Sequence, residues 1–323
     1  MSGLVRVGVI GRGFGERVVA PAFASIDDCE VVDVVSARDE RVVRDLCARR
    51  DLDLVSVHSP PFLHARDVRL ALDGGHAVLC DKPFGTGAVV SRALYDEARE
   101  RGVVHLVNFE FRYDPVRRAV RQAIADGAVG RVEHVQWTHL SAGSRVPLRR
   151  YGWLFRRDHG GGWIGAWASH AVDTLRFLFG GEVDVVASAP RTTIRQRPDA
   201  HGVLHDCDAE DGLAALLGVA DGISVTIDSG FAAPVTMTPR IVVTGSDGVL
   251  EDVADRRLVV RTGDGRADLH VDDDSTGDRH AGPMARWAAV VRDAVRDGVA
   301  PDDAPTFADG VACAAVLDRL RMG

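Results

Sequence analysis

The sequence predicts an α/β protein with two domains, with a parallel sheet in the first and a large open, mostly antiparallel sheet in the second. A chain of 323 residues exceeds the size at which one hydrophobic core keeps growing. Strand patterns alternate with helical patterns up to residue 113, whereas apolar and polar residues mostly alternate one by one beyond it. We therefore expect domains at residues 1–113 and 114–323, the second of them an α+β domain.

In the first domain, short β-branched runs predict buried strands, and amphipathic runs predict the helices between them. Regular alternation of this kind implies right-handed βαβ units and hence a parallel sheet. The expected strands are 4–11, 29–37, 52–60, 76–83 and 103–111, and the expected helices are 16–25, 39–51, 63–75 and 87–102.

In the second domain, period-two patterns predict an open antiparallel sheet flanked by helices. The "SDG" at 246–248 lies between two strand-like runs and predicts a hairpin. The polar stretch 195–212, which contains proline and glycine, predicts a mobile loop. The expected strands are 131–141, 182–193, 222–232 and 240–263, and the expected helices are 160–181, 282–297 and 306–321.

Composition and charge exclude several classes of partner. A formal net charge of -8 argues against nucleic acid, and the apolar runs are too short to span a bilayer. The strand pattern at the N-terminus leaves no room for a signal peptide, and five scattered cysteines without a C-x-x-C pair indicate reduced thiols in the cytoplasm. His201, His205 and Cys207 are close in sequence, but no second cluster completes a zinc site, so we expect no metal.

The stretch "GVIGRGFGERVVAPAF" places Gly11, Gly13 and Gly15 between the first strand and the first helix. A dinucleotide-binding Rossmann domain needs glycine there for a tight turn and for close approach of the backbone to pyrophosphate. Glu16 stands where a further glycine or alanine would fall, and a plain glycine turn is the alternative. Only one helix fits between strands 29–37 and 52–60, so we expect the sheet to lack one edge strand on the adenosine side.

The second strand ends in "VVSARDE", which bears on the choice of cofactor. NAD enzymes usually place an acid at this tip to hold the ribose diol, whereas NADP enzymes place small polar and basic residues there. Ser36 and Arg38 fit NADP, and Asp39 comes three residues late. We expect NADP, with NAD as the other possibility, and Arg38 as a solvated helix-start residue is the alternative interpretation.

The stretch "LCDKPFG" contains Lys82, the only lysine of the chain. The 39 lysine and arginine residues of the chain are otherwise all arginines. Arginine would serve equally well in a surface ion pair with Asp81, but a guanidinium cannot release its proton. Lys82 follows the C-terminal end of the fourth strand, where ligands collect in open parallel sheets. We therefore expect its amine, partly shielded from water by Leu79, Cys80 and Phe84, to polarise a substrate hydroxyl or carbonyl or to relay its proton.

Six stretches of the chain match one family when they are taken together: "GVIGRGFG…APAF", "HSPPFLHA", "LCDKPFG", "NFEFRYDP", "GGGWIGAWASHAVD" and "PTFADGVACAAVLDRLR". They resemble the glucose–fructose oxidoreductase, inositol dehydrogenase and MocA (Gfo/Idh/MocA) family over nearly the whole length. The resemblance implies a Rossmann domain followed by an α/β domain whose open sheet commonly forms the oligomer interface. It also implies hydride transfer between a nicotinamide cofactor and a carbinol carbon of a sugar, cyclitol or related polyol.

The resemblance also assigns catalytic residues. The family's E-K-P lysine corresponds to Lys82, with Asp81 in place of glutamate, and its acid/base histidine corresponds to His170. The aspartate that orients this histidine corresponds to Ala166, one helical turn earlier, so His170 needs another orienting group. Asp173 is the nearest candidate in sequence, and a hydrogen-bonded core histidine is the alternative for His170.

The remaining assignments concern the cofactor and the substrate. Arg112 could anchor a hydroxyl or carboxylate, or pair with Asp114, and His64 could simply start a helix. The stretch "PLRRYGWLFRRDHGGG" resembles a substrate loop with aromatic faces for a ring and arginines for an acid or phosphate, and an oligomer contact is the alternative. The expected cofactor residues also include Phe14, Ser59, Pro60, His64, Asp81, Lys82 and Asn108, and the expected substrate residues are Arg112, Tyr151, Trp153, Trp167 and Asp173.

We therefore expect a cytoplasmic NAD(P)-dependent oxidoreductase that acts on a small polyhydroxylated substrate and forms a homodimer or homotetramer through its C-terminal sheet. One alternative is a lyase or glycosidase in which transient oxidation acidifies a neighbouring carbon and NAD(H) is recycled. A second is a reductase of an imine or similar carbonyl analogue in a biosynthetic pathway. A third is a nucleotide-binding sensor without chemistry, against which the retained lysine speaks.

Overall fold

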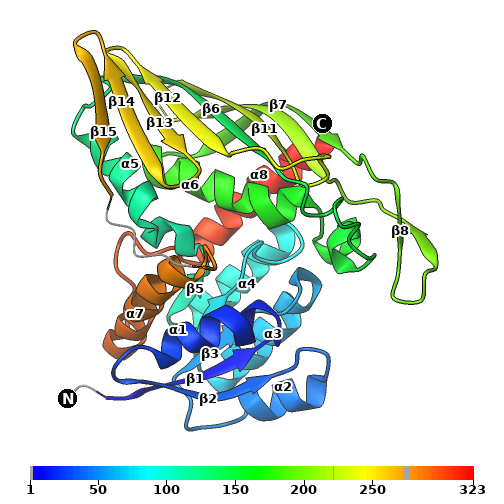
Figure 1. Cartoon of the computed structure of the whole chain (residues 1–323). Helices are drawn as coiled ribbons and strands as arrows, with labels where there is room; N and C mark the ends of the chain where they lie inside the picture. Colours follow the sequence, from blue (N-terminus) through cyan, green and yellow to red (C-terminus); the bar gives the residue numbers. More distant parts are fainter. Residues whose placement is uncertain (1–2, 221, 272–276) are drawn as a thin grey trace. The chain divides into compact units, whose positions relative to one another are not determined.

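The computed structural model describes residues 3–220, 222–271 and 277–323 (Figure 1). The chain divides into two compact units, Met1–Tyr113 with Asp274–Ala315, and Asp114–Asp273 with Val316–Gly323. The break after residue 113 coincides with the expected domain boundary. The segment Asp274–Ala315, however, belongs to the first unit and not to the second, where the sequence analysis places it.

The first unit contains a five-stranded parallel sheet in the order β2-β1-β3-β4-β5. The expected Rossmann sheet is therefore confirmed, and so is its missing edge strand, because within the described ranges β2 pairs with β1 alone. The strands are β1 (Val5–Ile10), β2 (Cys29–Val35), β3 (Leu54–Val57), β4 (Ala77–Cys80) and β5 (His105–Val107), and the helices between them are α1 (Ala20–Ala24), α2 (Glu40–Cys47), α3 (Pro61–Gly74) and α4 (Ala88–Arg101).

The helix α7 (Ala281–Asp297) explains why the chain returns to the first unit. Trp287 and Val291 on its apolar face are fully buried, in the same core as Val7 of β1 and Phe23 of α1. The Trp287 ring also stacks on Tyr113, with ring centroids 4.9 Å apart. A 3.6-residue pattern predicts such a helix correctly, but it does not indicate which sheet the apolar face will cover.

The second unit contains an eight-stranded sheet in the order β15-β14-β13-β12-β6-β11-β10-β7. Only the pair β11–β6 is parallel, so the expected open and mostly antiparallel sheet is confirmed. Helices α5 (Pro115–Ala125) and α6 (Ser169–Phe179), with the end of α8 (Phe307–Met322), lie along one face of this sheet (Figure 1). The strands are β6 (Val132–Leu140), β7 (Val183–Arg191), β10 (Gly212–Val219), β11 (Ile223–Gly230), β12 (Arg240–Gly245), β13 (Gly248–Val253), β14 (Arg257–Thr262) and β15 (Gly265–Leu269).

Some elements of the second unit differ from the expectation. The "SDG" hairpin is confirmed, with Thr244 opposite Val249, but β10 was not predicted, because "GLAALLGV" has a single β-branched residue. The stretch 195–212 is not a plain loop, because its strands β8 (Gln196–Pro198) and β9 (Leu204–Asp206) form a hairpin. Within the described residues, no helix is both long and apolar enough to cross a membrane.

Candidate functional site

The glycine turn connects β1 to a π-helical turn η1 (Gly15–Val19), which continues as α1. Gly11 has a φ of +127°, and an added Cβ would lie 2.4 Å from the carbonyl oxygen of His58. An added Cβ on Gly15 would lie 3.1 Å from both His58 Cβ and Val9 Cγ1. Gly11 is therefore required by the packing of the chain, because the segment after β3 passes directly behind the turn, whereas a side chain at Gly15 would need His58 or Val9 to shift slightly.

Gly13 differs from the other two glycines, because an added Cβ there would meet no atom within 4 Å. The N–H of Gly11 donates to the carbonyl of Val35 at 2.8 Å, so this amide is already engaged and is not available to hold a pyrophosphate. The N–H groups of a first helical turn have no intrahelical acceptor and favour an anion. The turn therefore fits a dinucleotide whose pyrophosphate approaches Gly13 and the start of η1, beside Phe14.

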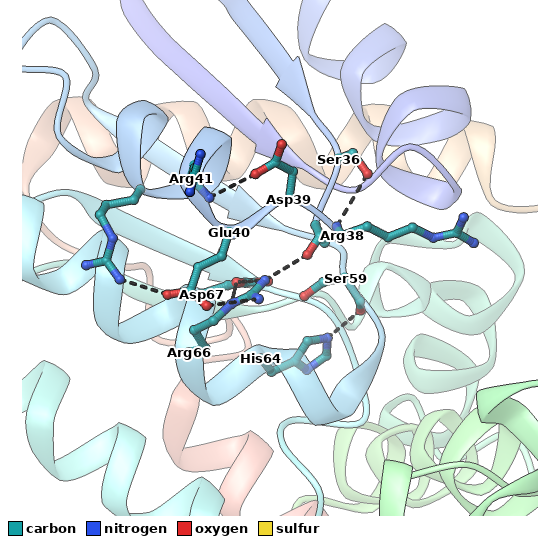
Figure 2. Close-up of polar contacts among 11 residues, drawn as sticks. Ser36, Arg38, Asp39, Glu40, Arg41, Ser59, His64, Arg66 and Asp67 are labelled. Carbon is teal, nitrogen blue, oxygen red and sulfur yellow. Dashed lines mark hydrogen bonds and ion pairs between the residues drawn. The ribbon is translucent and has the colours of Figure 1, made fainter.

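The turn after β2 carries the residues expected at the adenosine end of a dinucleotide (Figure 2). The Ser36 hydroxyl accepts the backbone N–H of Arg38 at 3.3 Å, and the Arg38 side chain is exposed. The Asp39 carboxylate accepts the N–H of Arg41 at 3.0 Å and so caps α2. The Asp39 carboxylate is thus used to cap α2. The C-terminal tip of β2 itself carries no carboxylate.

The sequence analysis missed a further cation at this turn. Arg66, in the second turn of α3, donates from Nη2 to the carbonyl of Ala37 at 2.8 Å (Figure 2). It lies two residues after His64 and directly follows the stretch "HSPPFLHA" that is matched to the family. That position is the signal that could have identified it.

Lys82 begins the connection that follows β4. Its N–H donates to Asp81 Oδ1 at 2.9 Å, and its peptide bond to Pro83 is cis. Because β1, β3 and β4 are parallel, their C-terminal ends bring Lys82, the glycine turn and His58 to the same edge of the sheet. The half-buried Lys82 is therefore placed within the first unit at the edge where parallel sheets bind ligands.

Asp81 is anchored from two sides. Its Oδ2 lies 3.4 Å from Nδ1 of His58, and its Oδ1 lies 3.4 Å from the amide nitrogen of Asn108. The His58 ring is fully buried, with its Nε2 2.7 Å from the hydroxyl of Ser56. Burial alone would raise the pKa of Asp81, but the contact with His58 and the charge of Lys82 lower it to about 2. Asp81 is therefore ionised and fixed beside Lys82, an arrangement that depends on a histidine which the sequence analysis did not select.

Three of the predicted cofactor residues hold the connection between β3 and α3 in place. Nε2 of His64 lies 2.7 Å from the carbonyl oxygen of Ser59, and Pro60 precedes the first turn of α3. The His64 ring is fully buried, and this burial lowers its pKa. His64 therefore stabilises the segment that passes behind the glycine turn as an uncharged ring.

Arg112 has a different partner from the one considered in the sequence analysis. Its Nη2 donates to Asp309 Oδ1 at 2.9 Å, and its Nη1 donates to the carbonyl of Asp303 at 3.3 Å. Asp114 instead caps α5 by accepting the N–H of Arg117 at 3.1 Å. The predicted alternative of an Arg112–Asp114 pair is therefore wrong, because Asp114 is used to start a helix.

In the second unit, His170 lies in the first turn of α6 and is buried. Residues Ile164–Ala168 just before it form a π-helical turn, η5, so Ala166 does not stand in a regular α-helical turn before His170. Asp173, three residues after His170, is also buried in α6. Asp173 is thus the carboxylate that the helix itself places next to His170.

An aromatic cluster surrounds the same segment. The rings of Trp163 and Trp167 stack with centroids 6.0 Å apart, and Trp163 also stacks on Phe231 at 4.6 Å. Nε1 of Trp163 donates to the hydroxyl of Ser229 at 2.8 Å, which fixes the orientation of its ring. Flat, oriented rings of this kind suit the apolar face of a small ring-shaped substrate.

The predicted substrate loop is only partly open. Trp153 is 37% exposed, whereas the Tyr151 ring stacks on His205 at 4.6 Å. His205 in turn contacts Asp199, with 2.9 Å between Nε2 and Oδ2. Across the described ranges, no group of three or more His, Cys, Asp or Glu side chains is arranged to hold a metal ion.

The fold and the glycine turn define the class of protein as an oxidoreductase with an NAD-binding Rossmann domain. Residues 5–109 match the family described as "Oxidoreductase family, NAD-binding Rossmann fold", and residues 117–251 match the "GFO/IDH/MocA C-terminal domain". The chain belongs to the GFO/IDH/MocA oxidoreductase family.

Individual relatives match at modest identity. An uncharacterized oxidoreductase of Synechocystis is 30% identical over 69% of this chain, an alignment that spans 64% of that relative. Inositol 2-dehydrogenase of Rhizobium meliloti is 28% identical over 97% of this chain and 95% of its own length.

Solved structures with the same fold hold either nicotinamide cofactor. A levoglucosan dehydrogenase in complex with NADH and levoglucosan has a TM-score of 0.86 at 21% identity, covering 98% of this chain and 96% of that one. A 3-ketoreductase from Actinomadura kijaniata in complex with NADP has a TM-score of 0.77 at 22% identity, covering 99% of this chain and 97% of that one. At these identities the likeness shows the fold alone.

The three glycines are expected to respond differently to alanine. Gly13→Ala should weaken NADPH binding about tenfold or more, with a change in the free energy of unfolding below about 0.5 kcal/mol, because the new methyl group enters open space. Gly11→Ala should cost roughly 1–3 kcal/mol or more, because of its positive φ and the nearby carbonyl of His58. Fluorescence titration with NADPH and urea unfolding measure the two effects. Normal NADPH binding by Gly13→Ala would contradict this assignment.

Asp81 is expected to make stability depend on pH in the acidic range. Its pKa in the folded state lies below the value of about 3.9 for an unfolded chain, so its contribution is present above that value and is lost as the pH falls towards 2. On the order of 1 kcal/mol should be lost between pH 5 and pH 3 in the wild type but not in Asp81→Asn. Urea unfolding at several pH values tests this, with the exposed Asp96→Asn as the control. Equal losses in the wild type and Asp81→Asn would refute it.

Proposed function

We propose that this protein is an NAD(P)-dependent oxidoreductase that transfers a hydride between the nicotinamide C4 and a carbinol or carbonyl carbon of a small, polyhydroxylated substrate. The observation that carries the proposal is Lys82, the only lysine of the chain, at the ligand-binding edge of the parallel sheet beside the ionised Asp81. A guanidinium would suffice for an ion pair there, whereas an amine can also exchange a proton.

In this proposal each residue has a defined task. A bound nicotinamide accepts the hydride from the substrate carbon during oxidation and returns it during reduction. Lys82 donates a hydrogen bond to the reacting oxygen, which favours the charge that develops on it, and its amine can relay the proton of that oxygen. His170 takes the hydroxyl proton as the alcohol becomes a carbonyl, and it gives the proton back in the reverse direction. Asp173 is proposed to orient His170 in place of the carboxylate absent at Ala166.

The substrate class rests on the aromatic cluster and on relatives. Trp163, Trp167 and Phe231 form a stacked aromatic cluster of which Trp163 is partly exposed, and similar proteins include an inositol 2-dehydrogenase and a levoglucosan dehydrogenase. A small cyclic polyol combines apolar C–H faces with a rim of hydroxyl groups, which suits such surfaces. The five cysteines are all free thiols, which agrees with the cytoplasmic location that we propose.

We also propose that the uncovered face of the eight-stranded sheet joins copies of this chain. A row across this face is formed by Leu216, Thr226, Gln136 and Val242, which stand opposite one another on adjacent strands. None of these four residues is charged, and Leu216 is 39% exposed. A sheet face turned away from the helices and crossed by such an uncharged row is typical of a surface that another subunit covers.

Variants of Lys82 test the catalytic proposal. Lys82→Ala and Lys82→Arg should bind NADPH within about threefold of the wild type, yet lose about a hundredfold or more in turnover, because neither side chain offers a titratable amine. Turnover is measured with NADP⁺ and NAD⁺ on a panel of sugars and cyclitols, with the exposed Arg99→Ala as the control. Full activity of Lys82→Arg would overturn the role. Product formation without net cofactor reduction would favour the lyase or glycosidase alternative.

The proposed interface has its own test. Leu216→Glu should reduce the molar mass measured by light scattering during size-exclusion chromatography, because it introduces a charge into the uncharged row. Val89→Glu changes an equally apolar residue, which is 86% exposed on α4 of the first unit, and should leave the mass unchanged. A wild-type protein that elutes as a monomer would refute the interface.

A further inference from the structure

Arg66 is held in one orientation by a buried carboxylate. Its Nε donates to Asp67 Oδ1 at 2.8 Å, and its Nη2 lies 2.7 Å from the same oxygen. The Asp67 side chain is fully buried, while that of Arg66 is 27% exposed. A guanidinium backed by a buried carboxylate loses little conformational freedom when it binds a ligand, because its position is already fixed.

The fixed guanidinium contacts the turn after β2. In Rossmann domains this turn faces the ribose position at which NAD and NADP differ. Arg66 Nη2 also donates to the carbonyl of Ala37, and Ala37 lies between Ser36 and Arg38 (Figure 2). The turn is therefore tied to α3 by a second guanidinium, which contacts its backbone at Ala37, while the Arg38 side chain extends away from the turn on the other side (Figure 2). In NADP the ribose at this turn carries a 2′-phosphate, which two arginines bind well.

One face of Arg66 retains donors for such a ligand. Nε and Nη2 make the bonds to Asp67 and Ala37, whereas the group nearest to Nη1 is Glu40, with Oε2 at 3.8 Å, beyond hydrogen-bond distance. Glu40 is itself held by Arg44, whose Nη2 lies 2.8 Å from its Oε1. The Glu40 carboxylate is therefore partly neutralised, which reduces its repulsion of a phosphate.

We propose that Arg66 is a specificity-determining residue that selects NADP(H) over NAD(H), by offering Nη1 to the 2′-phosphate together with Arg38 and the hydroxyl of Ser36. This inference rests on the proposed dinucleotide-dependent function, but it concerns the choice of cofactor and not the chemistry at Lys82. It also accounts for the buried carboxylate of Asp67, which positions the Arg66 guanidinium at the turn.

The test uses two nucleotide fragments that differ by the 2′-phosphate alone, 2′,5′-ADP and 5′-AMP, titrated calorimetrically into the full chain. The wild type should bind 2′,5′-ADP more tightly. Arg66→Met should raise the Kd of 2′,5′-ADP roughly tenfold or more and that of 5′-AMP less than about threefold, because only the former loses a charge-assisted bond. Arg69→Met removes the same charge one turn further along α3, where the arginine bonds Glu97, and should leave both values unchanged.

A second variant protects the test from loss of folding. Arg66→Met leaves Asp67 as an unpaired buried charge, so Arg66→Met combined with Asp67→Asn removes both charges and should show the same selective loss. An equal loss for both fragments would show a merely structural role for Arg66 and overturn the inference. A wild type that binds 5′-AMP as tightly as 2′,5′-ADP would overturn the inference while leaving the dinucleotide site intact. A wild type that binds neither fragment would overturn both the inference and the proposed function.

Discussion

The first unit depends on the close approach between the glycine turn and His58. The carbonyl of His58 lies where a Cβ on Gly11 would be, so β1 and β3 can end side by side only if residue 11 is glycine. The same histidine extends its ring to Ser56 and Asp81, and Asp81 holds the N–H of Lys82. The segment that shapes the nucleotide turn thus also fixes the lysine. Binding of a cofactor and positioning of the reacting group are therefore properties of one packed edge of the sheet.

Much of this edge could be predicted from the sequence, because its signals are local. Glycines between a strand and a helix, and a lysine after a buried strand, predict positions on an α/β sheet without further information. Contacts between segments that are far apart in the sequence have no such local signal, so they could not be predicted. The partner of Arg112 is Asp309, which lies 197 residues later. Ala37 and Arg66 are 29 positions apart in the sequence and come into contact only in the folded chain. The role of His58 could not be predicted from the sequence either, because it depends on the meeting of the ends of three strands.

The second unit shows the same limit in a different form. Period-two patterns identified the sheet but not all its strands, because β10 is rich in alanine and leucine, which carry a weak strand signal. The match at Ala166 assumed a regular helix before His170, whereas the chain forms a π-helical turn there. Such turns often occur at functional sites because they change the direction of side chains. A missing carboxylate and an altered backbone thus fall on the same few residues, so the surroundings of His170 differ from those of a histidine paired with aspartate one α-helical turn earlier.

Two buried carboxylates of the first unit respond in opposite ways to the same cost of burial. The pKa of Asp81 is lowered to about 2, because burial is outweighed by His58 and by the charge of Lys82. The pKa of Asp67 is raised by burial, which Arg66 only partly offsets. An aspartate that is stabilised from two sides suits a constant charge beside a reacting group. Asp67 relies on a hydrogen bond with Ser59 and on Arg66 to offset its burial, and it stays ionised more readily when that arginine is held close to it. Asp67 and Arg66 therefore stabilise each other. This explains why a buried carboxylate lies behind a guanidinium that contacts a surface turn.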